Sequence, residues 1–232
     1  LWWGLFWLMF APSVGALAST LFNYPEYLGI SEYLTFGRLR PMHVNGVIFG
    51  AFSTLFIGLC YYVLPRLCGV RVWNGQWGHT LLWVWNLGLA AGMALLAMGW
   101  NQGLEAGEFP FVIDVVIVIV VLITTVQFLV TVAQRKEPQL FVAVWYLIGA
   151  FVWTVLNLIL GSFILPYAIT GINSAAFHGL FIHYIVGLWI TPAGYVLIYY
   201  FLPASIKNPV YSHKLSLVGF WSLALFYPFV GI

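Results

Sequence analysis

The sequence predicts an all-α, polytopic transmembrane protein, and three observations lead to that fold class. Hydrophobic residues make up 63% of the 232 residues and charged residues only 6%, with a mean hydropathy of +1.00. Soluble domains carry roughly 25% charged residues, so this chain cannot build a water-exposed surface. Its apolar runs of about 20 residues are typical of helices that cross a bilayer, whereas the alternation of a membrane β-barrel strand is missing.

Seven apolar segments follow one another along the chain and are expected to form seven helices of one bundle. Turn-forming and charged residues separate them, as in the stretch from Asn23 to Glu26. The predicted spans are residues 1–22, 41–65, 78–100, 110–134, 140–166, 174–203 and 213–232. Because the chain starts and stops inside apolar runs, we expect residues 1–232 to be a single transmembrane domain of a longer protein, with its seventh span truncated.

The charges between the segments predict how the bundle is oriented. The second, fourth and sixth loops hold six of the eight basic residues: Arg66, Arg71, Arg135, Lys136, Lys207 and Lys214. The other loops hold Arg38 and Arg40 among several glutamates. By the positive-inside rule the even loops are cytoplasmic and the first span runs outward. The sequence thus predicts a multi-pass protein of the cell membrane.

His43 is the most informative single residue. It lies at the start of the second apolar segment, close to Arg38 and Arg40, and by the predicted orientation near the outer face. An ionisable side chain at membrane depth needs a partner and is functional by default. Haem iron is one such partner, and arginines suit the propionates of a haem. The two arginines also lie on the side where the charge rule disfavours them, which indicates that something anionic holds them.

His183 and Tyr227 are predicted to meet inside the membrane. His183 lies nine residues into the sixth span, about 13 Å at a helical rise of about 1.5 Å. Tyr227 lies fourteen residues into the seventh span, which enters from the other side, or about 21 Å. Across a hydrocarbon core of about 30 Å the two side chains reach nearly the same depth, where they make a candidate metal and proton site.

Ser216 precedes Tyr227 by eleven residues, which is nearly the same face of a helix. With His213 it forms a polar stripe from the cytoplasm towards Tyr227, as a proton path needs, although a lone serine is also a common packing contact. Glu105 and Glu108, three residues apart in the third loop, could bind a hard cation such as calcium or simply face water. His178 is more simply an outer hydrogen-bonding residue than a second metal ligand.

Composition also excludes some classes of function. The net charge of +2 is too small to indicate a nucleic-acid partner. The two cysteines, Cys60 and Cys68, lack a metal-ligand spacing and are most simply buried apolar residues. The many aromatic residues at the ends of spans are typical of the interfacial belt of a membrane protein, whose partner is lipid.

Three separated motifs resemble one family. The stretch from Thr35 to Phe49 (TFGRLRPMHVNGVIF) is similar to the second-helix motif of the catalytic subunit of cbb3-type cytochrome c oxidases, which are C-family haem–copper oxygen reductases. The stretch from His183 to Pro203 resembles their sixth helix, and the stretch from Pro209 to Tyr227 resembles their seventh. The resemblance covers essentially all 232 residues and implies the fold of a haem–copper oxidase subunit I.

The resemblance implies roles for individual residues. His43 matches an axial ligand of the low-spin haem b, with Arg40, and more weakly Arg38, on its propionates. His183 matches a ligand of the copper that pairs with a high-spin haem b. Tyr227 matches the tyrosine that is cross-linked to that histidine and donates a proton and an electron during oxygen cleavage. Two further matches are Ser216 to a residue of the proton-uptake channel and Glu105 to a carboxylate associated with a calcium ion.

Some positions depart from the family pattern. Ile182 and Tyr184 flank His183 where the family usually has glycine and asparagine, and His213 stands where tyrosine is common. The remaining copper and haem ligands are expected after Ile232, beginning with a His-His pair.

The resemblance implies a terminal respiratory oxidase of the bacterial inner membrane. Such a subunit reduces oxygen to water with electrons from cytochrome c, works with cytochrome c-type oxidase subunits and pumps protons. The nearest alternative is a nitric oxide reductase, which typically carries a glutamate where this chain has Gly187 and lacks the tyrosine that Tyr227 matches. A non-catalytic haem b membrane anchor with His43 and His178 on one haem, or a transporter, are further alternatives.

Overall fold

The computed structural model describes residues 1–28 and 31–230, and within these residues the regular elements are all helical. Six helices are long and apolar enough to cross a membrane, counted over the described residues. They are Trp2–Asn23, Phe36–Cys68, Trp77–Ala97, Phe111–Ala133, Val142–Ala168 and Ile172–Ile206. The predicted fold class, an all-α transmembrane bundle, is therefore confirmed.

The chain divides into two compact units. Unit 1 comprises residues 1–58 and 79–120, and unit 2 comprises residues 59–78 and 121–232. That the whole chain is a single transmembrane domain stays a prediction.

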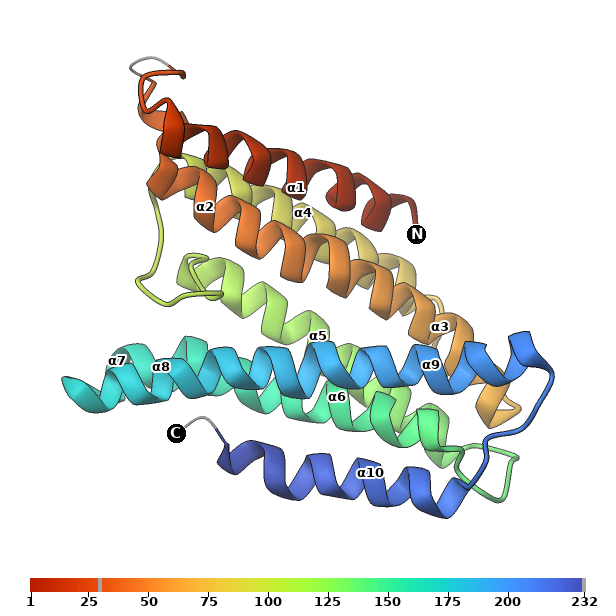
Figure 1. Ribbon diagram of the computed structural model, residues 1–232. Coiled ribbons are helices and arrows are strands. Elements are labelled where there is room, and N and C mark those ends of the chain that lie inside the picture. Colours follow the sequence, from red (N-terminus) through yellow and green to blue (C-terminus); the bar gives the residue numbers. More distant parts are fainter. Residues whose placement is uncertain (29–30, 231–232) are drawn as a thin grey trace. The chain divides into compact units, whose positions relative to one another are not determined.

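Unit 1 is built on α1 (Trp2–Asn23), which lies along α2 (Phe36–Asn45) and the segment η2 (Gly46–Ser53) that continues it (Figure 1). Small residues allow this close approach. A Cβ added to Gly46 would lie 2.7 Å from the Cβ of Ala11, and one added to Gly50 would lie 2.8 Å from the Trp7 ring. Trp7 is also tied to α4 (Trp77–Ala97), because its Nε1 donates to Asn86 Oδ1 at 2.8 Å. Close packing and buried hydrogen bonds thus hold the helices together. This is expected in a membrane, because lipid tails are themselves apolar and the hydrophobic effect does not drive helices to associate there.

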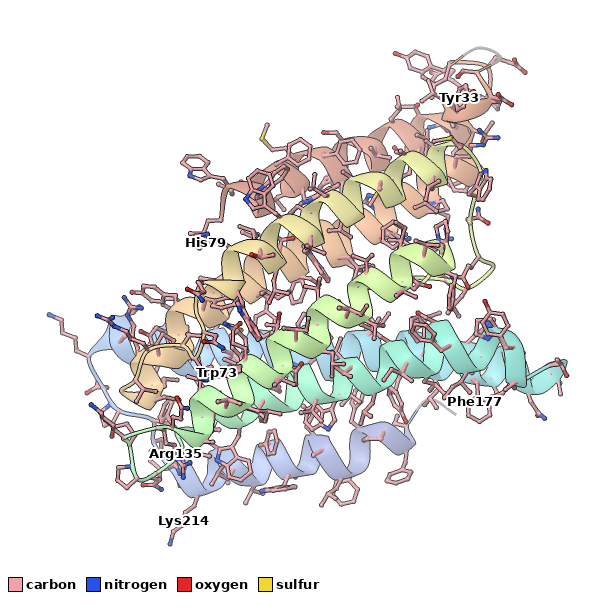
Figure 2. All side chains as sticks on the ribbon, turned by 180° about the vertical axis from the view of Figure 1, so that it is seen from behind. Tyr33, Trp73, His79, Arg135, Phe177 and Lys214 are labelled. Carbon is pink, nitrogen blue, oxygen red and sulfur yellow. The ribbon has the colours of Figure 1, made fainter. Side chains whose placement is uncertain are left out.

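Unit 2 is centred on α6 (Val142–Ile159), which is packed against α9 (Thr191–Ile206) and α10 (His213–Phe226). Stacked and edge-on aromatic rings fill this contact, with Tyr146 of α6 between Tyr195 and Phe220. Figure 2 shows Trp73, Arg135 and Lys214, from the three even loops or their edges, at one end of this unit and Phe177 at the other. The even loops of this unit thus lie at one end of its helices, as the predicted orientation requires.

The remaining elements complete the two units. They are η1 (Glu32–Leu34), α3 (Thr54–Cys68), α5 (Phe111–Ala133), η3 (Leu160–Ile164), α7 (Leu165–Ala168), α8 (Ile172–Tyr184), η4 (Ile185–Ile190) and η5 (Tyr227–Phe229). Three of the spans contain a π-helical stretch: η2, η3 and η4.

Two predicted spans differ from the structure by more than three residues at one end. The second begins at Phe36 rather than at residue 41, because Thr35 is extended and its carbonyl accepts the first helical hydrogen bonds, from Arg38 and Leu39. The seventh, predicted over 213–232, is a 14-residue α-helix that ends at Phe226. Pro228 explains this end, since proline has no backbone N–H to donate to the carbonyl four residues earlier. Residues 231 and 232 of that predicted span lie outside the described residues.

Candidate functional site

In unit 1, His43 is held by the backbone of α1. Its Nδ1 lies 2.9 Å from the carbonyl oxygen of Ala11. A carbonyl can only accept, so Nδ1 is the donor, and in the neutral ring the lone pair is on Nε2. Gly15, one turn further along α1, lets the ring approach, because a Cβ there would overlap it. A histidine that donates through one nitrogen and offers the other has the arrangement of a metal-ligating imidazole. His43 therefore fits the haem-ligand role that the resemblance implies.

Arg38 and Arg40 have different partners. Arg38 Nη1 donates to the carbonyl oxygen of Ala97 at 2.8 Å, at the end of α4, where helical carbonyls lack partners of their own. Arg40 forms an ion pair with Glu105, and its Nη1 lies 3.7 Å from Glu108 Oε1. The sequence indicated that an anionic group holds these arginines. For Arg40 the structure identifies two carboxylates of the chain itself.

Glu108 is the buried member of this charged cluster, with an exposed fraction of 5%. Asn45, the last residue of α2, donates through Nδ2 to Glu108 Oε2 at 2.7 Å. Burial raises the pKa of the Glu108 carboxyl above its ordinary value, while the hydrogen bond from Asn45 and the charge of Arg40 act in the opposite direction. Two buried oxygens here, Asn45 Oδ1 and Glu108 Oε1, make no hydrogen bond among the described residues.

These oxygens bear on the predicted calcium. Hard cations take carboxylate and amide oxygens, so these two atoms, which lack a hydrogen bond, are of the right kind. In residues 1–28 and 31–230, however, no three histidine, cysteine, aspartate or glutamate side chains gather closely enough to hold a metal ion. The role of Glu105 at a calcium ion therefore stays a prediction.

In unit 2, His183 and Tyr227 lie face to face. Their ring centroids are 4.1 Å apart and the ring planes differ by 2°. Tyr227 donates through its hydroxyl to the His183 carbonyl oxygen at 3.3 Å, and His183 Nε2 lies 3.2 Å from the Tyr227 carbonyl oxygen. Tyr184 adds a hydrogen bond to the Pro228 carbonyl oxygen at 2.9 Å. The two side chains that the sequence predicted to share one depth are in contact. The copper and the cross-link stay predictions.

Ser216 lies on α10, close to the helix start, and is buried. Its hydroxyl donates to the carbonyl oxygen of Ser212 at 2.9 Å, one turn back in its own chain. Nearby, His213 Nδ1 lies 3.4 Å from Gln139 Nε2, and His213 Nε2 is buried and makes no hydrogen bond among the described residues. The role of Ser216 in proton uptake stays a prediction.

Sequence reasoning missed the π-helical stretches that follow each histidine. His43 precedes η2 and His183 precedes η4. At the end of both stretches a hydroxyl donates to the carbonyl five residues earlier: Ser53 to Ile48 at 2.7 Å and Thr191 to Val186 at 3.0 Å. Such stretches are rare and often occur at functional sites. The available signal was a hydroxyl residue at the end of a glycine-containing apolar stretch, which hydropathy alone does not reveal.

A comparison with known families settles the membership of the chain. The profile of the family described as cytochrome C and quinol oxidase polypeptide I matches residues 1–232. The chain belongs to this family. With its six apolar helices, it is a multi-pass protein of the bacterial inner membrane. The predicted fold of a haem–copper oxidase subunit I is thereby confirmed.

Curated relatives agree with this family. A cytochrome c oxidase subunit 1 homolog of Agrobacterium tumefaciens is 31% identical over 98% of this chain and 44% of its own length. A bacteroid homolog from Bradyrhizobium diazoefficiens is 32% identical over 98% and 43%. The cbb3-type cytochrome c oxidase subunit CcoN1 of Stutzerimonas stutzeri is 29% identical over 97% and 49%. The chain spans less than half the length of these relatives.

Proposed function

We propose that the chain is part of the catalytic subunit of a cbb3-type cytochrome c oxidase, which reduces oxygen to water with electrons from cytochrome c and pumps protons. The observation that carries the proposal is the contact between His183 and Tyr227. A histidine and a tyrosine whose ring centroids are 4.1 Å apart would provide a metal ligand beside a proton donor. The chain's family is that of haem–copper oxidases, which supports the same conclusion.

Each residue has a defined task in this proposal. His43 would offer Nε2 to the low-spin haem b, and Arg40 and Arg38 would face its propionates. His183 would supply one ligand of the copper, whose other ligands, with that of the high-spin haem, are expected in the part of the relatives' length that this chain does not cover. When bound, the haem and copper would supply the oxygen-binding and electron-transfer chemistry.

The remaining residues move protons or hold charge. Tyr227 would deliver a proton from its hydroxyl, and Ser216 would relay protons towards it from the cytoplasmic end. Glu105 would bind a calcium ion together with neighbouring oxygens, and this would hold the charged cluster of Arg40, Glu105 and Glu108 in place. Cytochrome c-type subunits and cytochrome c would be the electron-donating partners.

Metal analysis of the full-length protein, purified from membranes with its partner subunits, tests the proposal. We expect two haems b and one copper for each copy of this subunit, besides the haem c of the partner subunits, and oxygen consumption with reduced cytochrome c. Extra non-haem iron without copper, together with reduction of nitric oxide, would instead establish the nitric oxide reductase alternative. The sequence beyond residue 232 offers an independent check, since a His-His pair is expected soon after it.

A further inference from the structure

Gly187 lies in the π-helical stretch η4, four residues after His183, and is buried. A Cβ added to it would overlap the Tyr227 ring, and its three nearest atoms all belong to that tyrosine side chain. The backbone of Gly187 does not require glycine, since its φ is not in the left-handed region. Glycine inside a helix is less favourable than alanine. Glycine at this position therefore serves to leave space for the Tyr227 ring.

That space determines where the Tyr227 ring lies. The ring has Gly187 on one side and is stacked on His183, and the Tyr227 hydroxyl is fixed by the His183 carbonyl at 3.3 Å. A side chain at position 187 and the tyrosine ring therefore compete for one volume. Tyr227 itself lies in the short turn η5, directly after α10 ends, so its backbone is held less firmly than that of a helix interior.

We propose that Gly187 is a positioning residue, which places the Tyr227 ring against His183 and so sets the geometry of the candidate copper and proton site. The catalytic consequence rests on the proposed function, whereas the placement of the ring does not. A side chain at position 187 would occupy the volume that the ring fills and would displace the ring from its stacked position.

The chain provides matched controls within the same continuous helix, Ile172–Ile206. Gly179 and Gly194 have no atom within 4 Å of an added Cβ, so alanine at either position adds the same methyl group without a clash. The three alanine variants add the same methyl group, and they differ only in whether that group meets Tyr227. It does so in Gly187→Ala and not in Gly179→Ala or Gly194→Ala.

The test uses the full-length protein labelled with 3-fluorotyrosine, with the Tyr227 resonance assigned by its loss in Tyr227→Phe. In Gly187→Ala we expect the ¹⁹F resonance of Tyr227 to shift, because the ring leaves the ring-current field of His183. The two control variants should leave it in place. An unmoved resonance in Gly187→Ala would overturn the proposal whatever the protein's activity.

Turnover provides the second readout. We expect the kcat for oxygen reduction in Gly187→Ala to fall about 10²-fold, the loss that a misplacement of about 1 Å can cause, with KM for oxygen unchanged. A shifted resonance with full kcat would refute the positioning role. If the unaltered protein lacks copper and oxygen reduction, the proposed function fails, and the ¹⁹F result still decides whether Gly187 places the ring.

A variant that does not fold is also informative. If Gly187→Ala gives no haem-containing protein, the double variant Gly187→Ala with Tyr227→Ala removes the ring and frees the space. We expect this double variant to accumulate to the same level as Tyr227→Ala alone. Failure of the double variant would contradict the proposal, because the methyl group would then clash with something other than the ring.

Discussion

The surroundings of His43 in unit 1 and of His183 in unit 2 follow the same local plan and differ in what holds the ring. Each histidine comes just before a π-helical stretch that ends in a hydroxyl bonded five residues back. His43 is fixed by a carbonyl of a neighbouring helix and lies against Gly15. His183 is instead stacked on a tyrosine from a short turn beyond α10.

This difference shows which part of the chain keeps each ring in place. The His43 ring has its donor nitrogen satisfied and its tautomer set within residues 1–58, so it can ligate a metal without rearrangement. His183 Nε2 likewise lies near a carbonyl oxygen, that of Tyr227 in η5, which leaves the lone pair of the neutral ring on Nδ1. We therefore interpret the His43 site as held by two packed helices and the His183 site as dependent on the short turn η5 for its position.

The largest expected effects come from removing each histidine in the full-length protein. His43→Ala should abolish the low-spin haem spectrum and leave copper in place, whereas His183→Ala should lose copper and keep the low-spin haem. Both variants should reduce oxygen turnover by more than about 100-fold. Loss of a residue that only hydrogen-bonds to a metal ligand typically costs about 10–100-fold, and loss of the ligand itself should cost more. Haem spectra and copper content measure the separation. Loss of both cofactors in either variant would contradict two separately built sites.

Much of this comparison was accessible from the sequence, and the reasons are physical. The shared depth of His183 and Tyr227 was predicted from helical rise, since nine residues from one side and fourteen from the other reach nearly the same level of a bilayer about 30 Å thick. The same count assumed a regular helix through Tyr227, whereas α10 ends at Phe226. One residue beyond a helix end changes depth very little, and the two rings are in contact.

Other features depend on contacts that no local pattern contains. Asn45 and Glu108 are 63 residues apart, and only the packing of unit 1 brings their side chains together. The π-helical stretches consist mainly of apolar residues, as transmembrane α-helices do, so hydropathy cannot distinguish the two. Gly187 and Gly15 are recognisable only once the ring that each accommodates has been located.

A second prediction tests whether the His43 site is preformed. Gly15→Ala places a methyl group where the His43 ring lies, and overpacking of this kind costs about 1–3 kcal/mol. We expect lower occupancy by the low-spin haem and a lower thermal midpoint, both followed by absorbance. Gly37→Ala is the control, because no atom lies within 4 Å of its added Cβ. Equal haem occupancy in the two variants would show that the ring can move freely.

Glu108 gives a pH-dependent test that applies to unit 1. Since its folded-state pKa is raised above the ordinary 4.5, the folded protein binds this proton more tightly than the unfolded chain. The contribution to stability is thus full below the ordinary value and is lost as pH rises through the folded pKa. Its size is about 1.4 kcal/mol for each pH unit that separates the folded-state pKa from the unfolded-state pKa. Glu108→Gln stays neutral and should lack this decline.

Thermal unfolding in detergent between pH 4 and pH 8, about the range in which a raised carboxyl pKa acts, measures the difference. Glu105→Gln is the matched control, since it removes a carboxylate of the same loop that is largely exposed. That variant should keep a decline, reduced in size because the charge of Glu105 helps to raise the pKa of Glu108. A decline that persists in Glu108→Gln would assign the pH dependence to another group.

The smallest expected effects concern the hydroxyls that end the two π-helical stretches. Ser53→Ala and Thr191→Val each remove one hydrogen bond to a carbonyl five residues earlier, worth about 0.5–1.5 kcal/mol. Ser53 is fully buried and Thr191 is not, so Ser53→Ala should lower the thermal midpoint more. The cofactor signals separate the sites further: Ser53→Ala should broaden the low-spin haem band, and Thr191→Val should weaken copper binding. If neither the haem band nor copper binding changes, these hydroxyls stabilise the helices without orienting the histidines. The two regions would then share their local backbone structure and not a functional role for it.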